Sequence, residues 1–129
     1  MSGLTSNSVR MMEKSADFLW AKQAAHLDNI SNAETPGYKT KTVTFEEQFG
    51  MKLRAAANRD GLTRRKEIRR VIENSDWKVW EDDEITRMDE NGVNVTEQMV
   101  ESIRTAYQLQ YVYQSINSDL GRLSKAING

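Results

Sequence analysis

The chain has 129 residues, a formal net charge of −1, no cysteine and one histidine, which excludes disulfides, thiolate metal sites and histidine clusters within one chain. No apolar run approaches the roughly 20 residues that span a bilayer, and residues 1–10 lack an apolar core, so we expect no conventional cleaved signal. Because hydrophobic residues make up only 38%, we expect this short chain to complete its core with neighbours.

Residues 5–31 are predicted to form a long amphipathic helix, since no proline or glycine interrupts them. Their apolar residues recur at spacings of three and four, the heptad pattern of a helix that packs against another helix. Gln23 and His26 stand in the same row, where polar residues cost stability but fix register. The apolar members of this N-terminal seam are Val9, Met12, Ala16, Leu19 and Ile30.

The helix is predicted to end before the sequence Thr35-Pro36-Gly37-Tyr38. Pro36 cannot continue a helix and favours extended backbone at Thr35. Proline followed by glycine is typical of a type II turn, because proline presets φ and glycine tolerates a positive φ. We therefore expect the chain to reverse direction here.

The following segment, 32–93, is predicted to be a charged middle region with little regular structure. Residues 39–44 and 76–80 suit short extended segments, and 45–57 suits a short helix that Gly50 weakens. A basic block at 52–70 precedes an acidic block at 73–91, and the two can pair within one chain or between copies. Trp77 and Trp80 either form a small core here or anchor a subunit contact.

Residues 94–128 are predicted to form a second long helix, which Asn94 caps with Glu97 three residues later. Tyrosines broaden its apolar face. Its seam consists of Met99, Ile103, Leu109, Val112, Ile116, Leu120, Leu123 and Ile127. The sequence thus predicts one mainly α domain over 1–129, in which two terminal helices pack as a coiled-coil-like pair around a small irregular or β middle segment.

Residues for catalysis or ligand binding are sparse. His26 is best explained as a polar residue at a helix contact, and the acidic run 81–84 lacks the spacing of a calcium loop. The basic cluster 64–70 has no aromatic residue beside it, which disfavours nucleic acid. There is no Gly-rich phosphate loop. We expect no enzymatic activity, no metal and no cofactor.

One stretch carries a family resemblance. The sequence 29–39, NISNAETPGYK, resembles the signature with which the first helix of flagellar rod and hook proteins ends. Ser31 stands where alanine is usual, and Glu34 where asparagine or aspartate is common. Residues 92–99 resemble the family's entry into its C-terminal helix. The matching motif residues are Asn29, Ile30, Asn32, Ala33, Thr35, Pro36, Gly37 and Tyr38.

Within that family, the short length and small middle segment are similar to proximal rod proteins. Residues 35–38 with the adjoining Phe45-Glu46-Glu47 look most like the FlgB type. Residues 93–100 also resemble the FlgC type, which is the alternative.

The resemblance implies a structural subunit of the bacterial flagellar basal body. Such a subunit is exported by the flagellar type III apparatus and assembles with itself into a helical rod on the periplasmic side of the inner membrane. The implied partners are other rod proteins, a FliE-like adaptor, the inner-membrane ring and the export gate, with no nucleic acid or small-molecule substrate. Phe45 and Phe49 fit the Phe-x-x-x-hydrophobic export element of early substrates, although any short amphipathic helix shows the same spacing.

A different class also fits the two amphipathic helices. A soluble adaptor or chaperone would use the same apolar faces to bind one partner helix. A stable, folded dimer at micromolar concentration would favour that alternative over the exported subunit.

Overall fold

The computed structural model describes residues 6–45, 48–82 and 93–128. In chain order, its elements are α1 (Asn7–Ser31), β1 (Lys41–Phe45), α2 (Phe49–Ala57), α3 (Gly61–Asn74), β2 (Trp77–Glu81) and α4 (Val95–Asn128). The prediction of a mainly α chain with two long terminal helices and a small strand-containing middle is confirmed.

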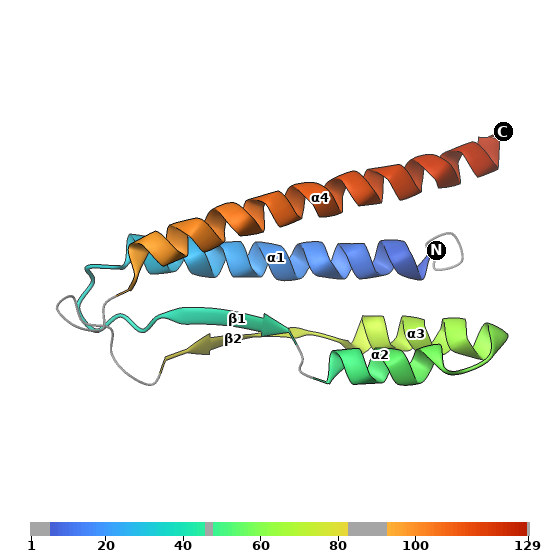
Figure 1. The fold of residues 1–129 in the computed structure, drawn as a ribbon, viewed down its shortest axis with the longest axis horizontal. Helices are drawn as coiled ribbons and strands as arrows, with labels where there is room; N and C mark the ends of the chain where they lie inside the picture. The colour runs from blue at the N-terminus through green and yellow to red at the C-terminus, as the bar shows by residue number, and fades with distance from the viewer. Residues whose placement is uncertain (1–5, 46–47, 83–92, 129) are drawn as a thin grey trace.

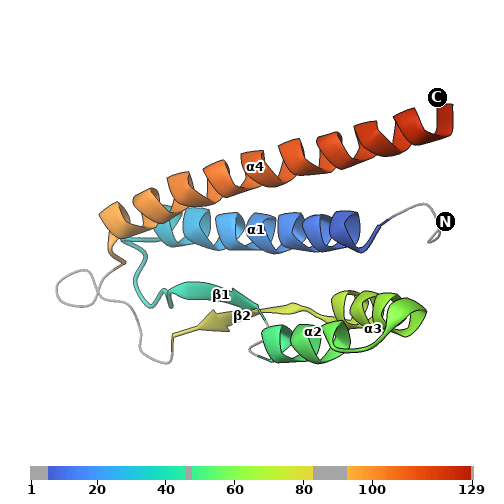
Figure 2. The same ribbon diagram turned by 45° about the vertical axis from the view of Figure 1, so that its right-hand side comes forward.

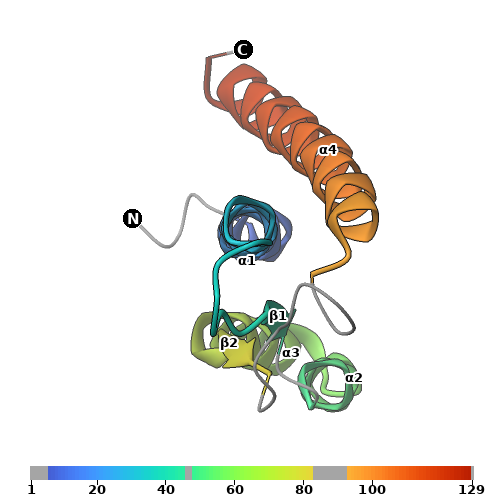
Figure 3. The ribbon, with the colours of Figure 1, turned by 90° about the vertical axis from the view of Figure 1, so that its left-hand side faces the viewer.

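The elements form layers around α1 (Figure 1). This helix contacts α4 on one side and contacts β1 and α3 on the other. The turned view in Figure 2 keeps the same order of layers. Viewed from the end, α4 crosses α1 obliquely (Figure 3). Because α4 has 34 residues and α1 has 25, the C-terminal end of α4 reaches beyond the start of α1 (Figure 1).

Both long helices begin with side-chain caps. Ser6 Oγ accepts the Val9 N–H at 3.1 Å at the start of α1. Asn94 Oδ1 accepts the Glu97 N–H at 3.0 Å at the start of α4, as the sequence predicts. These bonds satisfy donors that the first turn of a helix leaves without an intrahelical partner.

The contact between α1 and α4 has a small core, in which Ala16, Leu19 and Leu109 are buried and Phe18 and Val112 pack against them. Only eight hydrophobic residues of the described chain are buried, and three of these are alanines. Fifteen large hydrophobic residues are exposed in the same part of the chain. A single copy therefore leaves much of its apolar surface in water, which is unusual for a monomer.

The middle segment is more regular than the sequence predicts. β1 and β2 pair antiparallel, with Val43 opposite Val79 and Phe45 opposite Trp77. Trp80 is about half exposed and donates from Nε1 to Thr44 Oγ1 at 2.6 Å. Trp80 therefore does not form a buried core of this segment.

Two corrections concern the helices that follow. The predicted helix 45–57 begins at Phe49, because Phe45 is the last residue of β1. The helix α3 was not predicted. Its apolar positions Ile68, Val71 and Ile72 have helical spacing, but they stand among many basic residues. Buried Ala56 on α2 and buried Ile72 on α3 belong to these two contacting helices.

Within the described residues, none of the helices combines the length and the apolar character needed to cross a bilayer.

Candidate assembly surface

The centre of the motif is the side chain of Asn29, which is fully buried at 0% exposure. Its Oδ1 accepts the Tyr38 hydroxyl at 2.6 Å and the Lys41 N–H at 2.9 Å. Its Nδ2 donates to the Lys41 carbonyl at 2.8 Å and to Gln98 Oε1 at 3.2 Å. One amide thus connects α1, the turn, β1 and α4 with all of its polar atoms satisfied.

Gln98 also meets the single histidine. Gln98 Oε1 lies 2.8 Å from His26 Nδ1, and because Oε1 is an acceptor, Nδ1 must carry the hydrogen. The expectation that His26 lies at a helix contact is confirmed. The roles of Gln98 and Lys41 were not predicted, because no local pattern indicates that a residue 69 or 12 positions away binds Asn29.

The pKa values of two ionisable groups beside Asn29 are shifted from their ordinary values. Loss of solvent around Tyr38 raises the pKa of its hydroxyl above 10.0, while nearby Lys41 lowers it. The hydrogen bond from Lys41 Nζ to Asp28 Oδ2, 3.1 Å long, raises the pKa of Lys41 above 10.5. Both shifts favour the protonated forms that this arrangement uses.

The predicted turn is present. The Tyr38 N–H donates to the Thr35 carbonyl at 3.2 Å, and Gly37 has φ of +77°, as a type II turn requires at its third position. Thr35 Oγ1 donates to Asn32 Oδ1 at 3.1 Å, and Asn32 Nδ2 donates to the Asp28 carbonyl at 2.9 Å. The motif therefore ends the helix and aims Tyr38 at Asn29.

The structure divides the predicted seam residues into three groups. The first group is buried, the second is half-buried, and the third is exposed in a single copy. The buried members are Val9, Ala16, Leu19 and Leu109; the half-buried ones are Met12, Ile30, Val112, Ile116 and Leu123; the exposed ones are Met99, Ile103, Leu120 and Ile127.

Several exposed apolar side chains of α4 follow one another along its surface. Tyr107 and Tyr111 are 69% and 71% exposed, and Ile103 is 58% exposed. At 3.6 residues per turn, these positions lie roughly half a turn around the helix from Thr105 and Leu109, which are buried. We call this surface the outer stripe; its members are Met99, Val100, Ile103, Tyr107 and Tyr111.

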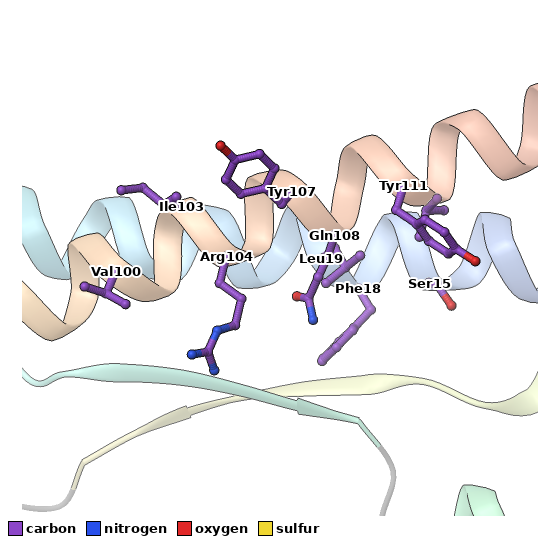
Figure 4. Close-up of a pocket in the computed structure, with 10 residues that line it drawn as sticks. Ser15, Phe18, Leu19, Val100, Ile103, Arg104, Tyr107, Gln108 and Tyr111 are labelled. Atoms are coloured by element: carbon purple, nitrogen blue, oxygen red, sulfur yellow. The ribbon is translucent and has the colours of Figure 1, made fainter.

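One edge of the outer stripe borders an open groove between α1 and α4, with a volume of about 770 Å³. Phe18 and Leu19 line it from α1, and Val112 lines it from α4. Four members of the outer stripe, Val100, Ile103, Tyr107 and Tyr111, also line this groove (Figure 4). The groove and the outer stripe together form a continuous apolar surface, which suits another helix rather than a polar small molecule.

The two phenylalanines of the possible export element come from different elements. Phe45 ends β1, and Phe49 begins α2. Their rings pack edge to face with centroids 5.0 Å apart, and Phe45 packs likewise on Phe18 at 5.4 Å. The interpretation of their spacing as one short amphipathic helix is therefore wrong. In the folded chain both rings contribute to packing beneath α1.

In the described ranges, no three histidine, aspartate or glutamate side chains are placed to hold a metal ion. The acidic run 81–84 lies partly outside these ranges.

The chain matches no protein-family model, no curated protein and no solved structure. Its function is therefore inferred from the motif around Asn29 and from the apolar surface of α4.

Proposed function

We propose that this protein is a structural subunit of the bacterial flagellar rod, similar to the proximal rod proteins of the FlgB type. The observation that carries the proposal is the outer stripe, because it gives α4 a second, exposed apolar side besides the one that packs against α1. A helix with one apolar side needs one neighbour, whereas a helix with two such sides needs a second neighbour to remove the rest from water. The wall of a helical tube provides such neighbours.

Assembly would be driven by burial of the outer stripe and the groove, at roughly 25 cal/mol per Å² of apolar surface. The small core of the single copy agrees with a subunit whose order depends on its neighbours, since ordering a helix costs conformational entropy that burial must offset. Such a subunit remains loose enough for export and becomes rigid in the rod.

The sequence resemblance supports the place of assembly. The proposed partners are further copies, other rod proteins, a FliE-like adaptor, the inner-membrane ring and the type III export gate. The proposed location is the basal body, on the periplasmic side of the inner membrane. Because Phe45 and Phe49 are packed in the folded subunit, an export receptor would contact them before folding.

The test is deletion of the gene in the source bacterium, followed by complementation. We expect the deletion to abolish swimming in soft agar and the wild-type gene to restore it. Ile103→Asp should be synthesised but should fail to restore swimming. The control is Met51→Asp, a similarly exposed apolar position on α2, which should restore it. Normal swimming of the deletion strain would refute the proposal.

The groove supports one other function, a soluble adaptor that seats a single partner helix between α1 and α4. Circular dichroism and sedimentation of the purified chain at rising concentration separate the two functions. Helicity that rises only on association supports the rod subunit. A fully helical monomer or dimer with a sharp melting transition supports the adaptor.

A further inference from the structure

The connection between α2 and α3 forms an exposed tip. Every residue from 57 to 66 is exposed. The tip lies at the end of the molecule where α1 begins (Figure 1), and Asn7 of α1 donates to the Arg65 carbonyl at 3.1 Å. This hydrogen bond attaches the tip to α1 through the backbone and leaves the side chains in solvent. We call this surface the basic tip; its members are Arg59, Leu62, Arg64, Arg65 and Lys66.

The basic tip concentrates positive charge in a chain that is nearly neutral overall. Residues 59–70 contain six basic and two acidic residues, whereas the rest of the chain contains 12 basic and 17 acidic residues. Of the two carboxylates, Glu67 pairs with Arg70 at 3.1 Å, and Asp60 is exposed just before α3. In the part of the chain that the structure describes, the four cations of the basic tip form no ion pair. Their charge is therefore available to a partner.

An apolar side chain projects among these cations. Leu62 is 65% exposed in the first turn of α3. Arg65 and Lys66 follow it by three and four positions, so the three side chains are neighbours on one side of the helix. An exposed apolar side chain surrounded by cations is typical of proteins that bind at a membrane interface, because the cations attract anionic headgroups and the apolar group enters the layer beneath them.

We propose that the basic tip binds an anionic lipid surface, with its cations at the phosphodiester headgroups and Leu62 inserted between them. A lipid surface is favoured over an acidic protein because the tip is convex. Lipids rearrange around a projecting group, whereas a protein partner must supply a matching concavity. The basic tip also lacks the aromatic side chains that would favour nucleic acid. This interaction goes beyond the proposed function and does not depend on it.

The distribution of charge also determines the orientation of the bound chain. An anionic surface attracts the basic tip and repels the rest of the chain, which has an excess of carboxylates, so the tip should face the lipid. The β1–β2 hairpin is attached through Asn29 to the other end of α1 and should lie away from it. Binding should weaken in salt, since the Debye length falls from roughly 20 Å at about 20 mM to roughly 4 Å at about 500 mM.

The first test is sedimentation of the purified full chain with vesicles of phosphatidylcholine that contain phosphatidylglycerol. We expect binding to these vesicles at low salt, little binding to pure phosphatidylcholine, and release at high salt. Arg64→Glu with Arg65→Glu should weaken binding at least about tenfold, because each cation near an anionic surface adds to the affinity. Arg64→Lys with Arg65→Lys keeps the charge and should retain most of the binding.

Two controls match these changes elsewhere on the chain. Lys39→Glu with Lys78→Glu, exposed positions beside and on the β1–β2 hairpin, changes the net charge equally and should alter binding by less than about twofold. Leu62→Ser should weaken binding by about threefold, since it removes the inserted apolar group. Met51→Ser, at a position of α2 that is 67% exposed, should leave binding unchanged.

The absence of cysteine allows the orientation to be measured directly. Thr63→Cys places an environment-sensitive fluorophore in the basic tip, and Thr42→Cys places it on β1. Both variants replace exposed residues without removing a charge. Vesicles that contain phosphatidylglycerol should shift the emission to shorter wavelength at residue 63 and leave it unchanged at residue 42.

Equal binding to both kinds of vesicle, equal binding of the arginine-reversed chain, or an emission shift at residue 42 alone would each overturn the proposal. Displacement from vesicles by glycerol phosphate at matched ionic strength would show that the tip takes a free phosphate and not a lipid surface. Equally tight binding of polyglutamate, with no effect of Leu62→Ser, would assign the tip to an acidic protein instead. Because the deletion strain reports swimming and the vesicles report lipid binding, the two proposals can fail separately.

Discussion

The side chain of Asn29 binds both backbone polar groups of Lys41: Oδ1 accepts the N–H at 2.9 Å, and Nδ2 donates to the carbonyl at 2.8 Å. This is the pattern that a neighbouring strand would provide, but here a helix side chain provides it. The start of β1 is thereby attached to the end of α1. The same amide makes two further hydrogen bonds: Oδ1 accepts one from the Tyr38 hydroxyl, and Nδ2 donates one to Gln98.

Asn29→Ala should therefore be among the most destabilising single substitutions. It removes four hydrogen bonds and leaves partly buried backbone groups of Lys41 without their Asn29 partners, so we expect a loss of about 3 kcal/mol in the free energy of unfolding. Urea denaturation followed by circular dichroism measures it. Asn117→Ala, at an exposed position of α4, is the matched control and should change stability by less than about 0.5 kcal/mol. Similar losses in the two variants would contradict the role of Asn29.

Tyr38→Phe should reduce stability by about 1 kcal/mol near neutral pH, because it removes the hydrogen bond from the hydroxyl to Asn29. It should also change the response to alkali. The folded-state pKa of Tyr38 is raised above its ordinary value of 10.0. The unfolded chain thus loses this proton first, so the stabilisation is complete below pH 10 and is lost as pH rises through the folded-state pKa.

This pH dependence is tested by measuring the free energy of unfolding of wild type and Tyr38→Phe at a series of pH values from neutral upward. The difference between the two proteins should shrink above pH 10. The largest cause of the raised Lys41 pKa is the hydrogen bond to Asp28, which Tyr38→Phe does not remove. Both proteins should therefore retain most of the alkaline loss that Lys41 causes above its ordinary pKa of 10.5. A difference that stays constant through this range would show that the Tyr38 hydroxyl is not linked to folding.

Glycine to alanine substitutions should have opposite effects at two positions. Gly37 has φ of +77°, and a β-carbon there would meet no atom within 4 Å. Gly37→Ala should thus destabilise through backbone strain alone, by about 1 kcal/mol. Gly121 lies inside α4 with equal free space, and Gly121→Ala should stabilise by about 0.5–1 kcal/mol. Thermal melts of the two variants should shift in opposite directions; a shift in the same direction would refute the turn assignment.

Leu109→Asp and Ile103→Asp should separate folding from assembly. Leu109 is buried against α1 at 6% exposure, so an aspartate there should cost about 3 kcal/mol or more and lower the melting temperature. Ile103 is 58% exposed, so Ile103→Asp should melt nearly like wild type. Sedimentation at high concentration should nevertheless show weaker self-association for Ile103→Asp. Unchanged association would exclude the outer stripe as the assembly surface.

Features that depend on a few consecutive residues were predictable from the sequence. Periodic apolar residues located α1 and α4, and Asn94 and Glu97 identified the start of α4, because a cap acts over three residues. Pro36 and Gly37 identified the turn, because each restricts its own backbone. Asn29 was part of the motif recognised in the sequence, but its hydrogen bonds with Lys41 and Gln98 were not apparent from the sequence.

The tertiary structure decided the features that depend on distant partners. Phe45 extends β1 because Trp77 lies opposite it, although its spacing from Phe49 also suits a helix. In the sequence, the apolar positions of α3 are fewer than the charged residues around them. In the folded structure, α2 packs against these apolar positions. The periodicity of α4 shows where its apolar residues are, but it does not show which of them α1 covers. Only the packed structure distinguishes buried Leu109 from the exposed outer stripe. Local sequence restricts the backbone, whereas the burial of a side chain is a property of its neighbours in space.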